Sequence, residues 1–226
     1  MGKTNFASIL DVAVLEPETT ANQVEQLCSD AKRYGYACVA VMPHRVKQTA
    51  ELLKGTNIKL SVAVGFPFGT TTAAVKAFET AEAIDNGANE VDFVMNVGRM
   101  KDGDFTAVKE DMAAVVKAAK GKNKDIIVKV ILETCLLTDS EIEKACKIAE
   151  EAGMDFVKCS TGFNSAGANS HVLSLMKKSV SDRVQVKASG QVRTYEKAVE
   201  FTNCGCTRLG CSMKSGIAIT TAALNG

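Results

Sequence analysis

The chain alternates between two patterns of apolar and polar residues. Short runs rich in β-branched and other apolar residues are typical of strands in a buried parallel sheet. They recur at 8–15, 38–42, 59–65, 90–96, 126–133, 156–160, 184–189 and 208–212. Stretches with helical spacing separate these runs. The sequence therefore predicts eight strands and seven well-marked helices, and the short apolar tail GIAITTAALN could supply an eighth helix.

Helix starts and ends can also be recognised. In the helix expected from Phe105, apolar residues recur on one face: Val108, Met112, Val115, Val116 and Ala119. The sequence TDSE at 138–141 is a capping box, and Thr20 is expected to begin another helix. Glycine tolerates the left-handed conformation that ends helices. It is found at six expected helix ends: Gly35, Gly55, Gly87, Gly121, Gly153 and Gly205.

The alternation of strands and helices predicts the fold class. Repeated strand–helix units imply parallel strands joined by right-handed crossovers. Eight such units predict an α/β protein with a closed (β/α)8 TIM barrel, formed as one domain over residues 1–226. A doubly wound open sheet is the alternative. The first strand is not followed by G-x-G-x-x-G, which disfavours a dinucleotide-binding version of that alternative.

Composition and charge exclude several classes of partner. Of the 226 residues, 46% are hydrophobic, enough for a large core, and the net charge is only +1. That balance disfavours nucleic acid or an anionic membrane surface as a partner, and no apolar run reaches membrane-spanning length. The segment 1–10 lacks the pattern of a signal peptide. We therefore expect a cytoplasmic protein whose eight cysteines are thiols.

Neither a metal nor another cofactor is expected. Cys204 and Cys206 form a CGC sequence, but no nearby pair of Cys or His completes four ligands. His44 and His171 are the only histidines, which disfavours both a histidine-rich metal site and a catalytic triad. The chemistry must then come from other side chains.

Charged residues interrupt several of the predicted strands. In a barrel strand, alternate residues face the interior. Applied to EVDFVMN, VKVILE, DFVKCSTGF, VQVKASG and the first predicted strand, this rule places three acids and three lysines inside: Asp11, Asp92, Glu133, Lys129, Lys158 and Lys187. Any one of them could be a paired structural charge. Because buried ion pairs rarely gain stability over apolar packing, the set favours chemistry at the C-terminal ends of the strands.

Two lysines close together favour a reactive amine. The pKa of a free lysine is about 10.4, and a neighbouring ammonium group and partial burial both lower it. Lowering it to roughly 7 requires about 4–5 kcal/mol, and one close like charge supplies about 3–4 kcal/mol. The neutral amine can attack a carbonyl to form a Schiff base, with Asp92 as the group that moves protons. These residues predict the chemistry of a metal-free aldolase.

Glycine-containing turns follow the last three predicted strands. They read STGF, SGQVRT and LGCSMKSG. Loops at these positions of a TIM barrel often bind phosphate through backbone N–H groups. Each turn could be an ordinary connection, but three in adjacent units favour a phosphate site.

Four blocks of the chain closely resemble deoxyribose-phosphate aldolases. They are GFPFGTTTAAVKAFETAEAIDNGANEVDFVMNVG, VKVILETCLLTDSEI, FVKCSTGF and VKASGQVRT, and the likeness runs in order over nearly the whole chain. The resemblance implies a class I aldolase of carbohydrate and deoxyribonucleotide catabolism. Such an enzyme reversibly cleaves 2-deoxyribose 5-phosphate to glyceraldehyde 3-phosphate and acetaldehyde.

The resemblance also implies roles for individual residues. Lys158 would form the Schiff base, Lys187 would lower the pKa of Lys158, and Asp92 would run proton transfer. Asp11 and Lys129 are further expected substrate-binding residues. The phosphate contacts would come from three turns: Thr161, Gly162, Gly190, Gln191, Gly210 and Ser212.

The chain departs from the family pattern near the expected substrate. The first strand reads LDVAVLEP where IDHTLLKP is common, so Ala13 replaces a hydroxyl residue and Glu16 replaces a lysine. Gln191 stands where the family usually has a second glycine, which makes a left-handed conformation costlier there. We expect these changes to affect substrate contacts and phosphate affinity, and Schiff-base formation to persist.

The last turn departs as well. It reads GCSMKSG where a shorter GTSSG is usual. A phosphate-facing serine is therefore either replaced by Met213 or displaced to Ser215, and Lys214 could compensate as a cation.

Two alternatives to this function stay open. One is a related Schiff-base aldolase with a different aldehyde acceptor, and the other is a barrel that binds a sugar phosphate without catalysis. The retained Lys158, Lys187 and Asp92 disfavour the second alternative. A homo-oligomer is possible.

Overall fold

The computed structural model describes residues 5–225. The predicted single domain, 1–226, also includes residues 1–4 and 226, which lie outside that range. Eight parallel strands pair in chain order and close into a barrel, which confirms the predicted (β/α)8 fold. The strands are β1 (Leu10–Val14), β2 (Cys38–Val41), β3 (Lys59–Val64), β4 (Glu90–Val94), β5 (Ile127–Ile131), β6 (Phe156–Lys158), β7 (Gln185–Ser189) and β8 (Cys206–Ser212).

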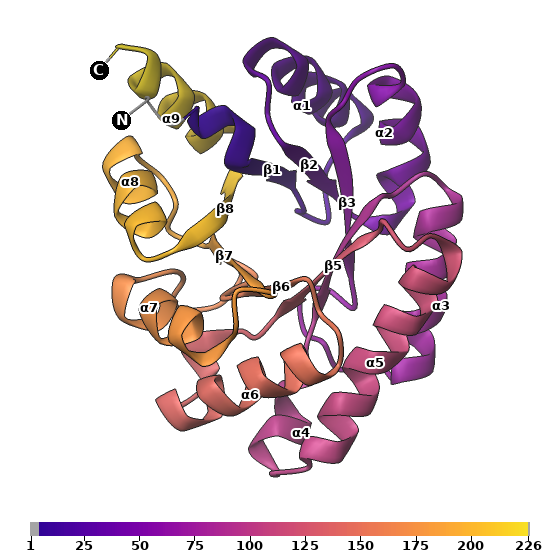
Figure 1. The fold of residues 1–226 in the computed structure, drawn as a ribbon. Helices are drawn as coiled ribbons and strands as arrows, with labels where there is room; N and C mark the ends of the chain where they lie inside the picture. The colour runs from indigo at the N-terminus through magenta and orange to yellow at the C-terminus, as the bar shows by residue number, and fades with distance from the viewer. Residues whose placement is uncertain (1–4, 226) are drawn as a thin grey trace.

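Helices surround the barrel as an outer layer (Figure 1). They are α1 (Ala21–Tyr34), α2 (Val46–Leu53), α3 (Ala73–Asp85), α4 (Val97–Lys101), α5 (Phe105–Lys122), α6 (Asp139–Glu151), α7 (Ser170–Ser179), α8 (Tyr195–Asn203) and α9 (Met213–Asn225). Short 3-10 helices are η1 (Phe6–Ile9), η2 (Pro43–Arg45) and η3 (Thr134–Leu136). The apolar tail forms α9, as the sequence suggested, and α9 lies beside η1 (Figure 1).

Capping residues explain where several helices begin and end. Thr20 and Thr138 both form complete capping boxes, the first with Gln23 and the second with Glu141. Gly121 was expected to end its helix, and this prediction is wrong. The other five predicted glycines have positive φ, but Gly121 does not, so α5 continues to Lys122.

The predicted strands are correct in number and order, but several are predicted too long at the C-terminal end. β4 ends at Val94, so Asn96 does not continue the inward face of that strand. The Asn96 side chain instead caps α4, where it accepts a hydrogen bond of 3.2 Å from the Arg99 N–H. Alternation therefore predicts side-chain direction only within the paired part of each strand.

The two faces of the strands differ in composition. Outward residues such as Val39, Val91, Val128 and Val186 are fully buried against the helices and form the main core. Across the interior face, strand register puts charged residues opposite one another. Asp92 pairs with Lys129, and Lys187 lies between Lys158 and Arg208. The barrel interior thus holds a cluster of charges.

Within residues 5–225, no helix has both the length and the apolar character needed to cross a lipid bilayer.

Candidate active site

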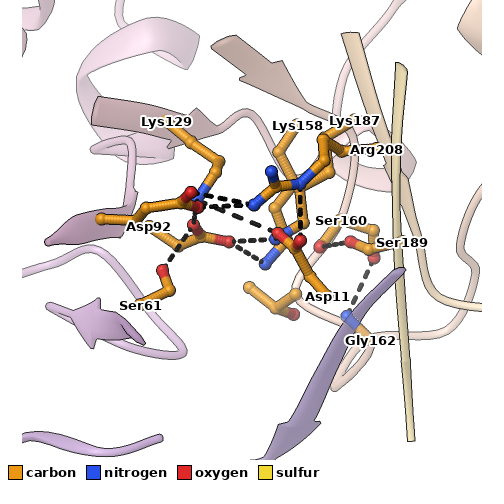
Figure 2. A network of polar contacts seen from close by, with 12 residues as sticks. Asp11, Ser61, Asp92, Lys129, Lys158, Ser160, Gly162, Lys187, Ser189 and Arg208 are labelled. Atoms are coloured by element: carbon orange, nitrogen blue, oxygen red, sulfur yellow. Dashed lines mark hydrogen bonds and ion pairs between the residues drawn. The ribbon is translucent and has the colours of Figure 1, made fainter. Parts of the chain in front are cut away.

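Asp92 is the centre of the charge cluster in the barrel (Figure 2). Its Oδ1 accepts hydrogen bonds from Lys129 Nζ at 2.7 Å and from the Ser61 hydroxyl at 2.9 Å. Its Oδ2 accepts from Lys158 Nζ at 2.8 Å and from Lys187 Nζ at 2.7 Å. Four donors converge on one buried carboxylate, so the structure brings the three predicted lysines to the predicted aspartate.

Asp11 forms the second carboxylate of the cluster. Its Oδ2 accepts from Lys187 Nζ at 2.5 Å, and its Oδ1 accepts from Arg208 Nε at 2.7 Å. Burial alone would raise the pKa of Asp11, but Lys187, Lys129 and Arg208 outweigh burial and lower this pKa to about 2. Asp11 is therefore a permanent negative charge beside Lys187.

The pKa values of the two lysines that were expected to interact are shifted in opposite directions. Burial lowers the pKa of Lys158; Asp92 opposes this effect, and Lys187 and Lys129 lower the pKa further. Burial would also lower the pKa of Lys187, but Asp11 and Asp92 outweigh it and raise this pKa. Lys158 is thus disposed to be a neutral amine next to a charged Lys187.

Asp92 and Lys129, two further members of the predicted set, stay ionised. Burial would raise the pKa of Asp92, but Lys129, Lys158 and Lys187 hold it well below its usual value. Burial would lower the pKa of Lys129, but Asp92, Glu90 and Asp11 raise it well above its usual value. Each charge is maintained by its neighbours.

Glu133 was predicted to face the lysines, and this prediction is wrong. β5 ends at Ile131, and Glu133 turns away from the strand direction with a left-handed φ of 55°. Its carboxylate accepts hydrogen bonds from the Thr161 N–H at 3.2 Å, from the Thr161 hydroxyl and from Asn164 Nδ2 at 3.1 Å. Glu133 therefore anchors the loop that follows β6.

A cavity of about 350 Å³ opens above the cluster at the C-terminal ends of the strands. Its lining includes Lys158, Lys187 and Asp11, but not Asp92 or Lys129, which lie beneath it. The six residues of the predicted phosphate turns also line it: Thr161, Gly162, Gly190, Gln191, Gly210 and Ser212. A small molecule in this cavity can reach the amine of Lys158.

The rim of the cavity depends on close backbone packing. Gly167 lies so near Gly190 that a Cβ built on it would be 2.6 Å from the Gly190 carbonyl carbon. The Ser160 hydroxyl accepts a hydrogen bond from the Gly162 N–H at 3.0 Å (Figure 2). The next residue after Gly190, Gln191, has a left-handed φ of 66°. The costly conformation anticipated at this non-glycine position is therefore present.

Several of the residues that depart from the family pattern are found at the same cavity. Ala13 and Glu16 both line it, and the Glu16 carboxylate accepts a hydrogen bond of 3.0 Å from the Leu15 N–H. Ser215 lines the cavity too, and its hydroxyl lies 3.1 Å from that of Ser212. The structure thus favours displacement of the second serine to position 215.

Met213 and Lys214 lie outside the cavity lining. Met213 packs against the core, and Lys214 is exposed.

Sequence reasoning missed two charged residues of the cluster, Glu90 and Arg208. The Glu90 carboxylate accepts from Arg208 at 2.7 and 3.0 Å and forms an ion pair of 2.5 Å with Lys129. The rule that alternate residues of a barrel strand face the interior could have found both residues. Glu90 has the same parity as Asp92, and Arg208 precedes Gly210 by two positions.

Three ligand-type atoms of Asp11, Cys38 and Glu90 lie within 4.8 Å of one another. A divalent cation could be considered there. However, the carboxylates of Asp11 and Glu90 are already paired with Arg208 and Lys129. Burial and the two carboxylates also keep the pKa of the Cys38 thiol well above its usual value, so the thiolate a metal prefers is disfavoured.

Comparison with known proteins identifies the family whose sequence pattern this chain shares. Residues 7–216 match the model of the DeoC/LacD family of aldolases. A deoxyribose-phosphate aldolase of Lysinibacillus sphaericus is 49% identical over 215 residues, covering 95% of this chain and 94% of that protein. A deoxyribose-phosphate aldolase of Carboxydothermus hydrogenoformans is 45% identical over 226 residues, covering 100% of this chain and 98% of that protein.

Solved structures are similar over the same length. The aldolase QR15 superposes with a TM-score of 0.91 at 32% identity, covering 98% of this chain and 97% of that chain. The tetrameric deoxyribose-phosphate aldolase of Aeropyrum pernix superposes with a TM-score of 0.88 at 28% identity. That match covers 96% of this chain and 90% of the other.

Proposed function

The chain belongs to the DeoC/LacD family of aldolases, and on that premise we propose that it forms a Schiff base on Lys158. The reaction is the reversible cleavage of 2-deoxyribose 5-phosphate to glyceraldehyde 3-phosphate and acetaldehyde. The single observation that carries this proposal is the position of Lys158. Its amine borders the cavity, its pKa is lowered by burial and by Lys187, and it shares one carboxylate with two other ammonium groups.

The neutral amine of Lys158 attacks the aldehyde carbon of the open-chain sugar to form an amino-alcohol adduct. The hydroxyl of that adduct takes a proton, for which Lys187 is the proposed donor, and leaves as water, which gives a protonated Schiff base. The bond between C2 and C3 then breaks, and its electron pair moves toward the iminium nitrogen to form an enamine. The hydroxyl on C3 loses its proton as it becomes the aldehyde of glyceraldehyde 3-phosphate. Protonation of the enamine carbon and hydrolysis release acetaldehyde and restore Lys158.

Asp92 and Lys187 are the proposed proton-transfer groups. The Asp92 Oδ2 lies 2.8 Å from the Lys158 amine and 2.7 Å from the Lys187 amine, so one carboxylate oxygen connects the two. Lys187 also lines the cavity, where its ammonium group can donate a proton to a reacting oxygen or carbon. The charge of Lys187 has a second consequence, because it disfavours a proton on Lys158.

The substrate phosphate is proposed to bind at the turns after β6, β7 and β8. Support comes from the convergence of these turns on the cavity, with the hydroxyls of Ser212 and Ser215 on one side. Gly210 has no side chain, and a Cβ there would lie 3.3 Å from the Lys187 side chain. Asp11 belongs to the charge cluster and also lines the cavity, so it can contact the sugar.

Lys129 was expected to bind substrate. Its amine is fully buried beneath the cavity, in contact with Asp92 and Glu90. We therefore assign it to holding Asp92 in place.

A turnover assay tests the proposed activity. The protein is incubated with 2-deoxyribose 5-phosphate, and acetaldehyde is measured by a coupled dehydrogenase. Release of acetaldehyde in proportion to enzyme supports the proposal. A folded protein that binds the sugar phosphate but releases no acetaldehyde would instead favour a non-catalytic sugar-phosphate-binding barrel.

A related aldolase with a different acceptor is the second candidate. It is favoured by Ala13 and Glu16, which line the cavity where the family commonly has a hydroxyl and a lysine. Synthesis from acetaldehyde and a panel of aldehydes distinguishes the two. Glyceraldehyde 3-phosphate should give the highest kcat/KM if the first candidate is correct.

A homo-oligomer in the cytoplasm completes the proposal. Phe68, Val75 and Phe78 expose large apolar side chains on α3 and the loop before it, as residues at subunit contacts do. All eight cysteines are free thiols, as is usual in a reducing compartment. A monomeric mass in light scattering, unchanged by Phe78→Glu, would exclude the oligomer.

A further inference from the structure

Beneath Lys158, the barrel holds a layer of charges to which six strands contribute. The cations of this layer, among residues 5–225, are Lys129, Lys158, Lys187 and Arg208. The anions are Asp11, Glu90 and Asp92. The two remaining strands, β2 and β3, contribute neutral groups, the thiol of Cys38 and the hydroxyl of Ser61. Four positive charges therefore face three negative charges when all three lysines are protonated and all three carboxylates are ionised.

Each cation except Lys158 contacts two carboxylates at hydrogen-bond distance. Lys129 contacts Glu90 and Asp92, and Lys187 contacts Asp11 and Asp92. Arg208 contacts Asp11 and Glu90. Of the carboxylates in residues 5–225, Lys158 contacts only that of Asp92, whose Oδ2 it shares with Lys187. The excess positive charge is therefore least stabilised on Lys158.

Glu90 and Arg208 do not contact Lys158 directly at hydrogen-bond distance but are linked to it through the other charged groups. Glu90 is fully buried, and neither residue lines the cavity. An arginine does not lose its proton in a protein, so Arg208 is a fixed charge in this balance. Its guanidinium occupies one oxygen of Asp11 and both oxygens of Glu90, which leaves less of their negative charge for the lysines.

Resting on the Schiff-base role proposed above, we propose that Glu90 and Arg208 are positioning residues that complete a charge balance in which Lys158 is the neutral amine. With Lys158 neutral, three cations match three anions. Loss of the Arg208 charge leaves an excess anion, and Lys158 then retains its proton more strongly. Loss of the Glu90 charge adds an excess cation, and Lys158 then loses its proton more readily.

The pH dependence of kcat/KM tests this assignment because the two changes act in opposite directions. Activity rises as Lys158 loses its proton, which gives the acidic limb of the profile. We expect Arg208→Met to move that limb to higher pH by about one unit, and Glu90→Gln to move it to lower pH by a similar amount. Arg208→Lys keeps the charge, so its limb should stay near that of the wild type, whatever its maximal rate.

A double variant and a direct measurement on Lys158 make the test independent of any one single-residue variant. Glu90→Gln with Arg208→Met removes one charge of each sign, so its limb should return toward the wild-type position. The rate at which borohydride traps the acetaldehyde adduct on Lys158, followed against pH by mass spectrometry, should show the same shifts. If Arg208→Met fails to fold, Glu90→Gln still tests the predicted direction of the pH shift, because glutamine has nearly the same shape as glutamate.

The outcomes separate this inference from the proposed function. Shifts of opposite sign support the charge balance. A lower rate without a shift, or shifts of the same sign in both single variants, would overturn it and leave Glu90 and Arg208 as purely structural residues. Absence of any adduct on Lys158 in the wild type would instead overturn the Schiff-base role itself.

Discussion

Two buried lysines of this chain differ in their surroundings. Lys76, on α3 outside the barrel, is fully buried, and its Nζ donates to Asp111 Oδ2 at 2.6 Å and to the Val94 carbonyl at 2.8 Å. Lys158, inside the barrel, donates to Asp92 Oδ2 at 2.8 Å. Burial is the main cause that lowers the pKa of both lysines. Burial alone therefore does not distinguish them.

The difference lies in the number of cations for each carboxylate. Asp111 is paired with Lys76 alone, which gives a one-to-one ion pair between α3 and α5. Asp92 is shared by Lys129, Lys158 and Lys187, and only the last two border the cavity. A lysine with its own carboxylate and no access to a cavity ties helices together. A lysine in a surplus of cations beside a cavity can act as a neutral nucleophile.

The largest expected effect comes from removing the reactive amine. Lys158→Leu should reduce turnover of 2-deoxyribose 5-phosphate by on the order of 10⁴-fold or more, because no Schiff base can form. The fold should remain or gain stability, because an apolar side chain replaces a buried amine while the other three cations still match the three anions. Steady-state kinetics and urea unfolding measure the two effects. Residual activity near the wild-type value would disprove the assignment of Lys158.

Removing the neighbouring charge should have a smaller effect that depends on pH. Lys187→Leu removes an ammonium group that lowers the pKa of Lys158, so this pKa rises. The acidic limb of the pH–rate profile should then move to higher pH, with roughly a 10²-fold loss of rate at neutral pH. An unshifted limb would show that Lys187 does not control the charge of Lys158.

The ion pair outside the barrel should affect stability instead of chemistry. Lys76→Met leaves the buried Asp111 without its partner, which should cost about 3–5 kcal/mol of unfolding free energy in urea. The double variant Lys76→Met, Asp111→Leu removes both charges and should recover most of that loss. If Lys76→Met abolished turnover while stability stayed unchanged, the distinction between the two lysines would be wrong.

The smallest effect is expected at the phosphate turn. Gln191 has a left-handed φ of 66°, and Gln191→Gly should relieve about 1 kcal/mol of backbone strain. A relaxed turn should lower KM for 2-deoxyribose 5-phosphate. The matched control is 2-deoxyribose without phosphate, whose KM should not change. An unchanged KM for the phosphorylated sugar would remove this turn from phosphate binding.

Much of the fold and site was predictable because strand alternation is a local rule. It put Lys129, Lys158, Lys187 and Asp92 on the interior face, and register then brought them together. It failed at Glu133 because the strand ends two residues earlier and the chain becomes left-handed. Sequence gives no sharp signal for that end, so a periodic pattern continues past the last paired residue.

Glu90 and Arg208 were missed for a different reason. Each lies near the start of its strand, where charged residues are usually solvated, and so neither attracts notice beside the apolar run that follows. Their importance depends on how many carboxylates each cation contacts across the barrel. That count is a property of the closed barrel.

The central claim is that Lys158 is the neutral amine that forms the covalent intermediate. Incubation with acetaldehyde, reduction with borohydride and peptide mapping by mass spectrometry test it most directly. We predict a single reduced two-carbon adduct on the peptide that contains Lys158, absent from the Lys158→Leu variant. A folded wild-type protein with no adduct, or with the adduct on Lys187 or Lys76, would contradict the account.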